Sequence, residues 1–341
     1  MSPCFEAATE IAKPVQPGRG ADLRCDDLFF DELKTNLTFD LKTIVNVTNF
    51  LPQMLRYLLG PSGKPCVEQI DTAPSVYLDH WALRKISTDP LLADCLVTTL
   101  QKNKGTLLLS WLHLEEFSSV TNRSHAIAAE QLVERLLPQV FFLEPDPFTV
   151  IGRENTLMAG GSPLPPHSDP DFLETFVHLR PSTPRPFTTQ GLFTSMQTSG
   201  QDLQLKALAA EIVQSLEKMR IETHANQQLH QRVLRLPTGT AIQHGTRLLL
   251  RELTRTFLLN TKLVITENHA IDLIHAVVPS AYADFVLLDK HWRVQVDQAR
   301  NRLLRAGLNI PVASVYSEKS EGIPKFFAAL ASWCHQTSLL K

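Results

Sequence analysis

The sequence predicts an α/β fold with a central parallel sheet flanked by helices. Short apolar runs typical of buried strands alternate with segments of helical periodicity, in residues 73–151 and again in residues 266–341. Strand–helix–strand repeats of this kind build parallel sheets with helices on both faces. The length of 341 residues and the apolar content of 43% are sufficient for a sizeable core, at about 150 residues per domain.

The N-terminal part, residues 1–72, is predicted to be a leader followed by a helical extension. Residues 1–25 mix proline, glycine and charge, whereas apolar residues recur at spacings of three and four from residue 26 to residue 59. The turn-rich "GPSGKP" at 60–65 ends this pattern. It is not a phosphate-binding loop, because Pro65 stands where serine or threonine is required.

The first α/β block, residues 73–151, contains three predicted strands separated by predicted helices. The strands are "SVYLD" at 75–79, "GTLLLSW" at 105–111 and "QVFFLE" at 139–144. The helices are 90–103, 113–120 and 124–137. Each strand is a short apolar run, as expected for strands that are buried in a parallel sheet.

Residues 152–265 interrupt this alternation. They are rich in proline, glycine, serine and threonine up to about residue 200, and helical periodicity then resumes at 201–220 and 241–259. We therefore expect an insertion of loops and helices between two parts of one domain.

The second α/β block, residues 266–341, restores the pattern. The run "AIDLIHAVV" at 270–278 predicts a helix that is short, because the residue before Pro279 avoids helical geometry. A strand "FVLLD" at 285–289, a basic helix at 290–306, a strand at 310–316 and a closing helix at 321–334 follow.

Composition excludes several classes of protein. The formal charge of −2 provides no global basic field for nucleic acid, so any phosphate-binding surface must be a local patch. The five cysteines form no C-x-x-C pair and fit reduced thiols in a cytoplasmic protein. No signal-peptide core and no run of membrane-spanning length is present, so no membrane association is expected. No G-x-S-x-G or G-x-G-x-x-G motif supports a serine hydrolase or a dinucleotide site.

Carboxylates stand where predicted strands end. Asp79 ends "SVYL" and Asp289 ends "FVLL", and ligands of open parallel sheets bind beyond the carboxyl ends of the strands. The simpler interpretation is that each aspartate caps the next helix. Glu115 and Glu116 follow the second strand; they project about 100° apart on a helix, so only one of them faces such a site.

Asp272 is the most informative acid. It lies in the middle of an apolar helix, where a charge requires a partner or a metal, and His275 shares its face three residues later. Asp284 lies just before a strand, where a turn role or a supporting role behind the ligands is expected.

Four acids converging on one sheet edge would repel one another unless a divalent cation neutralised them. Oxygen ligands favour Mg²⁺ or Mn²⁺ over zinc, and such an ion keeps waters and accepts phosphate oxygens. This is the chemistry of metal-assisted phosphodiester cleavage.

The order of these motifs resembles that of the PIN-domain nucleases. The places of the family's four acids are filled by Asp79 in "VYLDHWALRKI", Glu116 in "LLLSWLHLEEF", Asp272 in "AIDLIHA" and Asp289 in "FVLLDKHW". The resemblance covers about residues 73–150 and 266–320. It implies a Rossmann-like fold, the four acids as catalytic metal ligands, and a Mg²⁺- or Mn²⁺-dependent endoribonuclease of the kind found in toxins, RNA turnover and defence.

Other residues near these acids are expected to assist them. Asp284, His275 and Glu115 would support the ligands from behind, and Lys290, His291 and Arg293 would contact RNA phosphates. The basic helix is as well explained by a solvated face, to which Arg300, Arg302 and Arg305 also belong. Trp81 and Trp292 are expected in the core rather than stacked on bases. An RNA substrate is the expected partner; an inhibitory protein and self-association stay open.

Two alternatives compete with the ribonuclease. One is a PIN-like RNA- or protein-binding regulatory module that cleaves weakly or not at all. The other is a different metallohydrolase, since His113-x-x-Glu116 and Asp272-x-x-His275 each place two ligands on one helix face and suit a transition-metal pair.

Overall fold

A computed structural model describes residues 55–59, 65–118, 120, 122–157, 166, 168, 189, 191–194, 203–238, 245–319 and 321–333. All of them belong to one unit, Thr48–Lys341. The leader and most of the predicted N-terminal helix, residues 1–54, lie outside the described residues.

The first described element is an antiparallel hairpin of β1 (Leu55–Leu59) and β2 (Pro65–Gln69). The helical prediction for residues 26–59 is therefore wrong at its end. The five-residue run "LRYLL" is too short to separate the helical from the strand periodicity, and its pairing with β2 makes it a strand. Gln69 then joins the hairpin to the main sheet, because its side chain bonds the backbone N–H and C=O of Phe142 at 2.6 and 3.3 Å.

The main sheet has five parallel strands in the order β5-β4-β3-β6-β7. These are β3 (Ser75–Leu78), β4 (Thr106–Leu109), β5 (Val140–Phe142), β6 (Phe285–Leu287) and β7 (Ser314–Tyr316). The predicted parallel sheet is confirmed. The chain runs outward from β3 to β5 and then returns to the other side of β3 to form β6 and β7, so the strand order reverses between β3 and β6.

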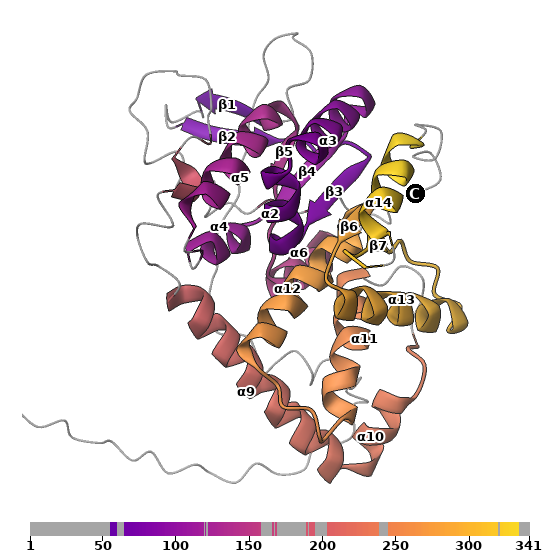
Figure 1. Ribbon diagram of the computed structural model, residues 1–341. Coiled ribbons are helices and arrows are strands. Elements are labelled where there is room, and N and C mark those ends of the chain that lie inside the picture. Colours follow the sequence, from indigo (N-terminus) through magenta and orange to yellow (C-terminus); the bar gives the residue numbers. More distant parts are fainter. Residues whose placement is uncertain are drawn as a thin grey trace, which may run out of the picture. The chain divides into compact units, whose positions relative to one another are not determined.

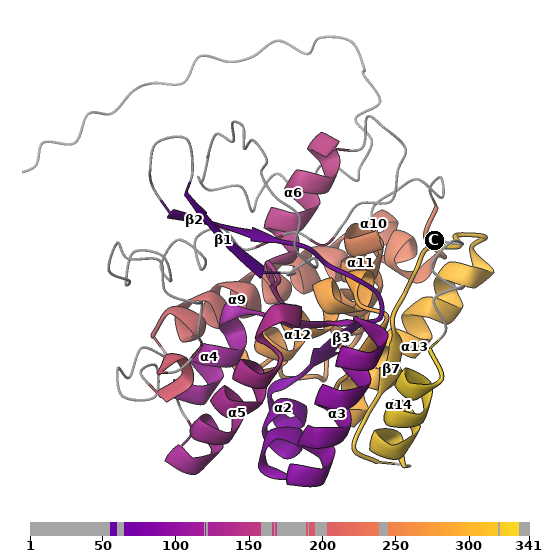
Figure 2. The same cartoon turned by 90° about the horizontal axis from the view of Figure 1, so that it is seen from above.

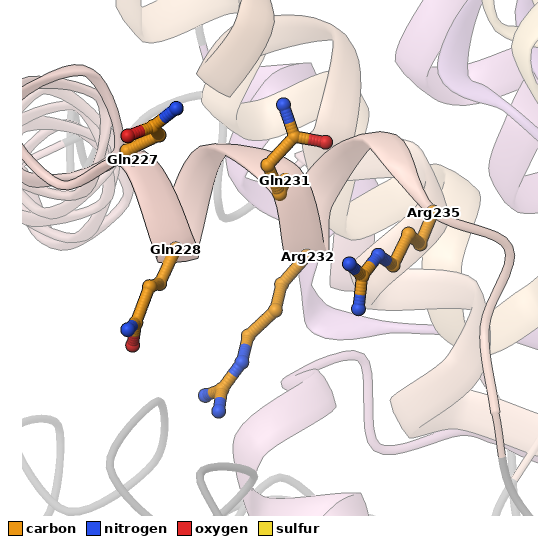
Figure 3. Close-up of a pocket in the computed structure, with 5 residues that line it drawn as sticks. All are labelled: Gln227, Gln228, Gln231, Arg232 and Arg235. Atoms are coloured by element: carbon orange, nitrogen blue, oxygen red, sulfur yellow. The ribbon is translucent and has the colours of Figure 1, made fainter.

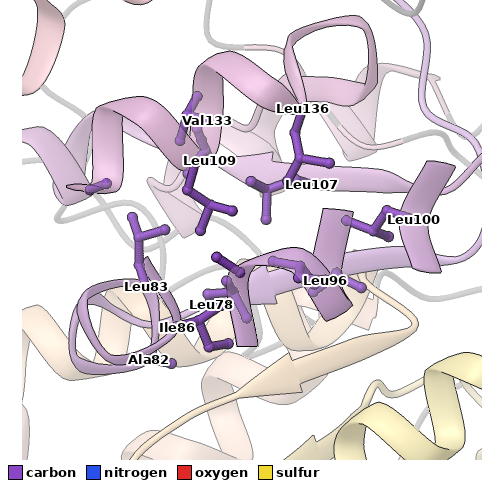
Figure 4. Close-up of a cluster of buried hydrophobic side chains, with 14 of the residues drawn as sticks. Leu78, Ala82, Leu83, Ile86, Leu96, Leu100, Leu107, Leu109, Val133 and Leu136 are labelled. Atoms are coloured by element: carbon purple, nitrogen blue, oxygen red, sulfur yellow. The ribbon is translucent and has the colours of Figure 1, made fainter. Parts of the chain in front are cut away.

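One face of the sheet is covered by four helices (Figures 1 and 2). They are α2 (His80–Thr88), α3 (Pro90–Asn103), α5 (Arg123–Arg135) and α14 (Gly322–Ala331). Leu78, Leu107 and Leu109 of the strands pack there against leucines of α2 and α3 and against Val133 (Figure 4). Truncating one such leucine to alanine costs about 2–5 kcal/mol, so this layer is a major source of stability.

The other face receives Tyr77, because successive strand residues point to opposite sides. There it meets α12 (Glu267–Tyr282), against which α11 (Gly245–Leu259) and α13 (Lys290–Arg305) pack. The other helices of the described residues are α4 (Trp111–Ser118), the short 3₁₀ turn η1 (Leu137–Gln139), α6 (Pro147–Leu157), α9 (Leu203–Ala225) and α10 (Gln227–Leu234).

Two boundaries differ from the sequence patterns. Helix α12 continues through Pro279 to Tyr282, so the short helix predicted here is wrong. Proline removes one backbone donor, but Val278, Pro279 and Ser280 are all buried, and Ala283 N–H still donates to the Pro279 carbonyl at 2.8 Å. Helix α6 runs across residue 152, where we placed the start of the insertion. The described residues 203–238 and 245–259 of that insertion are largely helical.

None of the helices in the described part of the chain combines the length and the apolar character that a bilayer span requires.

Candidate metal centre

The predicted acids meet at the point where the strand order reverses. Asp79 directly follows β3, and Asp289 comes two residues after β6, which is paired to β3. The two strand ends are joined by a hydrogen bond of 2.9 Å from the Asp79 N–H to the Leu287 carbonyl. In open parallel sheets this crevice, beyond the carboxyl ends of the strands, is where ligands bind.

Both aspartates also begin helices, as the simpler interpretation proposed. Asp79 is the N-cap of α2, and its Oδ1 accepts from the His80 N–H at 2.6 Å. Asp289 is the N-cap of α13, and its Oδ1 accepts from the Trp292 N–H at 2.8 Å. Capping holds one oxygen of each carboxylate in place, so it positions these groups at the sheet edge.

Asp79, Glu116 and His275 form the centre of the site. Within the described residues they are the group whose potential ligand atoms all lie within 4.8 Å of one another. Glu116 comes from α4, after β4, and its Oε2 lies 3.0 Å from the Nε2 of His275 on α12. Glu116 therefore stands beside Asp79 as predicted, whereas His275 lies inside the group instead of behind it.

Asp272 and Asp289 lie next to this group but outside its 4.8 Å limit. Burial, together with the charge of Asp289, raises the pKa of Asp272 to about 6. Asp272 in turn raises the pKa of Asp79, so it contributes to the electrostatics of the centre. Asp272 thus interacts with Asp79 of the central group, and Asp289 interacts with Asp272.

Asp79 and His275 are buried, the side chain of Glu116 is 18% exposed, and the charges of the three side chains shift one another's pKa values. Burial raises the pKa of Asp79 to about 7, opposed by the charge of His275. Burial lowers the pKa of His275, but the charges of Glu116, Asp79 and Asp272 outweigh this and raise it to about 9. Burial likewise raises the pKa of Glu116, but the His275 cation beside it brings the value below the usual range. The His275 imidazolium is therefore the charge that compensates these carboxylates inside the protein.

Comparison with protein-family models, curated proteins and solved structures gives no match.

A row of buried polar side chains lies behind His275 and was not predicted. Tyr77 Oη is 2.5 Å from His275 Nδ1 and 3.5 Å from Ser110 Oγ. Ser110 Oγ is 3.2 Å from His113 Nδ1, and His113 Nε2 is 2.6 Å from the Leu78 carbonyl oxygen. His113 thus lies behind His275 and outside the group of potential ligands. The only sequence signals for this row are the polar groups of Tyr77 and Ser110 at strand positions that are otherwise apolar.

Asp284 lies at the opposite end of the same two strands. Its Oδ2 accepts from the Ser75 N–H at 2.9 Å, and the Ser75 hydroxyl lies 3.2 Å from the same oxygen. Since Ser75 begins β3 and Phe285 begins β6, these contacts join the strand starts, away from the acids. We expected either a turn role before the strand or a supporting role behind the ligands. The contacts of Asp284 correspond to the first of these roles. Glu115 is buried on α4 but does not belong to the central group.

The basic residues of α13 differ among themselves. Lys290 and His291 are exposed in its first turn, and Arg293 is half-buried. Further along, Arg300 bonds Asp297 and the Ala313 carbonyl, and Arg302 bonds Glu252 at 2.5 Å. These later arginines are therefore used in packing. Trp292 is 2% exposed and Trp81 packs against the main core, as predicted for both.

A separate pocket of about 370 Å³ lies along α10. It is lined by Gln227, Gln228, Gln231, Arg232 and Arg235 (Figure 3). None of the acids of the centre contributes to it, so it is a different feature of the surface.

The centre offers two carboxylates and one imidazole within reach of a single cation, with two further carboxylates beside them. Such a donor set fits Mg²⁺, Mn²⁺ or a transition metal.

Proposed function

We propose that this protein is a divalent-metal-dependent endoribonuclease that hydrolyses phosphodiester bonds. The observation that supports it most is the buried Asp79–Glu116–His275 group at the reversal point of a parallel sheet. A fold has no structural need to bury several acids together, because each raises the pKa of the next. Groups of this kind are characteristic of functional sites.

The residues present fit a Mg²⁺ or Mn²⁺ ion. Asp79 and Glu116 would bind it directly, and Asp272 and Asp289 would balance its charge and orient water at its edge. When bound, such an ion lowers the pKa of a water molecule and neutralises charge on the leaving oxygen. Lys290, His291 and Arg293, in the first turn of α13 directly after Asp289, would bind phosphates and bring the scissile bond to the acids.

The test is cleavage of structured and unstructured RNA in Mn²⁺ by the whole chain. We expect Asp79→Asn and Glu116→Gln to lower the rate at least a hundredfold, because each removes a charge that holds the cation. The matched control is Asp94→Asn, which removes an exposed aspartate of α3 whose side chain is 65% exposed. EDTA should abolish cleavage by the wild type and by the control.

Cleavage that survives Asp79→Asn, or that EDTA does not affect, would contradict the proposal.

A regulatory module that binds RNA or protein is the second candidate, and one observation favours it. The side chain of His275 lies 3.0 Å from that of Glu116, so the protein itself supplies a counter-charge to this carboxylate. A binding module needs no more than this. Tight RNA binding without calorimetric Mn²⁺ binding would support the module and exclude the nuclease. A role as a toxin or defence effector, with an inhibitory protein partner, belongs to the nuclease proposal and would fall with it.

A further inference from the structure

His275 is the member of the centre that an all-oxygen Mg²⁺ site would not require. It is fully buried, and it offers one ligand atom that lies within 4.8 Å of one carboxylate oxygen each of Glu116 and Asp79. Its Nε2 is 3.0 Å from Glu116 Oε2, so the two side chains form an ion pair when the ring is protonated. A buried ring nitrogen beside a carboxylate is placed as a metal ligand would be.

The hydrogen bonds behind His275 can be assigned a direction, beginning at their far end. The Leu78 carbonyl can only accept, so the Nε2 of His113, 2.6 Å away, must carry a proton. The Nδ1 of the same ring receives the Ser110 N–H at 3.1 Å, so this nitrogen carries no proton and the ring is neutral. The Ser110 hydroxyl, 3.2 Å away, donates to the same nitrogen.

The direction continues through Tyr77 to His275. With its own proton on His113, the Ser110 oxygen accepts from the Tyr77 hydroxyl at 3.5 Å. The Tyr77 oxygen is then the acceptor for the N–H at Nδ1 of His275, 2.5 Å away. Protonation at Nδ1 leaves Nε2 as the nitrogen whose lone pair faces the acids when the ring is neutral.

The geometry points to His275 Nε2 as a direct metal ligand, oriented by the chain Tyr77–Ser110–His113, so that the centre selects Mn²⁺ or another transition ion over Mg²⁺. This inference rests on the proposed metal centre and deepens it. Imidazole suits transition metals, whereas Mg²⁺ takes oxygen ligands almost exclusively. Metal-bound histidines commonly donate their second N–H to a fixed acceptor, which here is Tyr77.

The direct test is electron spin echo envelope modulation of Mn²⁺ bound to the whole chain, in a nitrogen-free buffer and without RNA. We expect ¹⁴N modulation from one imidazole in the wild type and in the control His230→Gln, whose histidine lies on α10. His275→Gln should remove the modulation. Bound Mn²⁺ without ¹⁴N modulation in the wild type overturns the inference, and so does modulation that survives His275→Gln in a folded variant.

A second measurement tests the role of Tyr77 and does not depend on replacing His275. Tyr77→Phe keeps the ring but removes the acceptor for Nδ1–H, and we expect a loss of Mn²⁺ affinity of about 10–100-fold. Mg²⁺ affinity should stay within about twofold, and Tyr316→Phe, on β7, should change neither affinity. Equal losses for both metals would show that Tyr77 acts only on the fold and would contradict the assigned chain.

The two proposals fail in different ways. ¹⁴N modulation in a protein that never cleaves RNA would leave the ligand assignment standing and remove the nuclease. RNA cleavage that is supported equally by Mg²⁺ and Mn²⁺, without ¹⁴N modulation, would support the nuclease and exclude His275 as a metal ligand.

Discussion

At the scale of single residues, Asp79 shows how one side chain serves both structure and site. One oxygen caps α2, and the same carboxylate belongs to the central group. The residue is 8% exposed, and burial raises the pKa of its carboxyl to about 7. The protein therefore holds Asp79 in an environment that disfavours its charge unless His275 or a cation lies beside it.

The metal-free protein should become less stable as pH rises from 5 to 9. The folded-state pKa values of Asp79, Asp272 and His275 all lie above their ordinary values, at about 7, 6 and 9. Each group then binds more protons in the folded state, so its contribution is complete at low pH and is lost as pH rises through the window. The lowered pKa of Glu116 acts below this range. Thermal unfolding in EDTA across this pH range measures the effect.

The matched variant is Asp79→Asn, which removes a buried charge but keeps a residue that caps helices well. At pH 8 in EDTA it should be more stable than the wild type by on the order of 1 kcal/mol. A melting temperature of the wild type that rises between pH 5 and 9 would contradict the charge assignments.

At the scale of elements, the two ends of the β3–β6 pair have different roles. The carboxyl ends present acids, whereas the amino ends are joined by the Asp284 carboxylate and Ser75. The hydrogen bond between Ser75 and Asp284 joins residues that are 209 positions apart in the sequence. Structure is maintained at one edge of the sheet, and the proposed chemistry takes place at the other.

Asp284→Ala should therefore destabilise the fold but spare the metal site. It leaves the buried Ser75 N–H without its acceptor, which costs about 1–3 kcal/mol in the free energy of unfolding. Urea denaturation measures this cost. Mn²⁺ affinity below the transition should match that of the wild type. The control Asp94→Ala loses only an exposed ion pair with Arg135 and should change stability by about 1 kcal/mol or less. A large loss of Mn²⁺ affinity in Asp284→Ala would contradict this assignment and would show that Asp284 supports the metal ligands.

At the scale of the whole molecule, the near-neutral net charge means that RNA binding would depend on a local group of basic residues. The formal charge is −2, so a long-range basic field does not attract a polyanion. The exposed first turn of α13 follows Asp289 directly, and this places Lys290 within a few residues of the acids. Among the described residues, Lys290 is the lysine or arginine nearest in sequence to any of the four acids.

The double variant Lys290→Ala with Arg293→Ala should weaken RNA binding and its salt dependence together. Each phosphate contact that is lost should reduce the slope of log K against log salt by about 0.7–0.9, so we expect a total reduction of about 1.4–1.8. Fluorescence anisotropy between low and moderate salt measures the slope. Lys325→Ala, which removes a lysine of α14, is the control. An unchanged slope in the double variant would assign these residues to a solvated helix face.

The sequence predicted those parts that depend on local pattern. Helix α3 begins and ends at the predicted residues, and the five strands of the sheet lie within the predicted runs, because apolar periodicity and turn residues carry that information. The N-terminal hairpin was missed because the run "LRYLL" is too short to separate the two periodicities. The continuation of α12 through Pro279 was missed because burial of the segment outweighs one lost hydrogen bond.

In the candidate site, the nearness of the acids could be predicted, but the inclusion of His275 and the row of polar side chains behind it could not. Asp79, together with one of Glu115 and Glu116, followed from the rule that ligands gather beyond parallel strand ends, and the choice of Glu116 came from the resemblance to the PIN-domain nucleases. The inclusion of His275 in the group and the chain behind it depend on contacts between residues such as Tyr77 and His275, which are 198 positions apart. Local spacing in the sequence does not indicate which residues so far apart in the chain come into contact.

The most direct test of the metal centre is a crystal soaked in MnCl₂ and measured for anomalous scattering. We predict one peak bounded by the carboxylates of Asp79 and Glu116 and by His275 Nε2, at ligand distances of about 2 Å. The ¹⁴N measurement then assigns the imidazole independently. No peak between these side chains at saturating Mn²⁺, with His275 still paired to Glu116, would contradict the account.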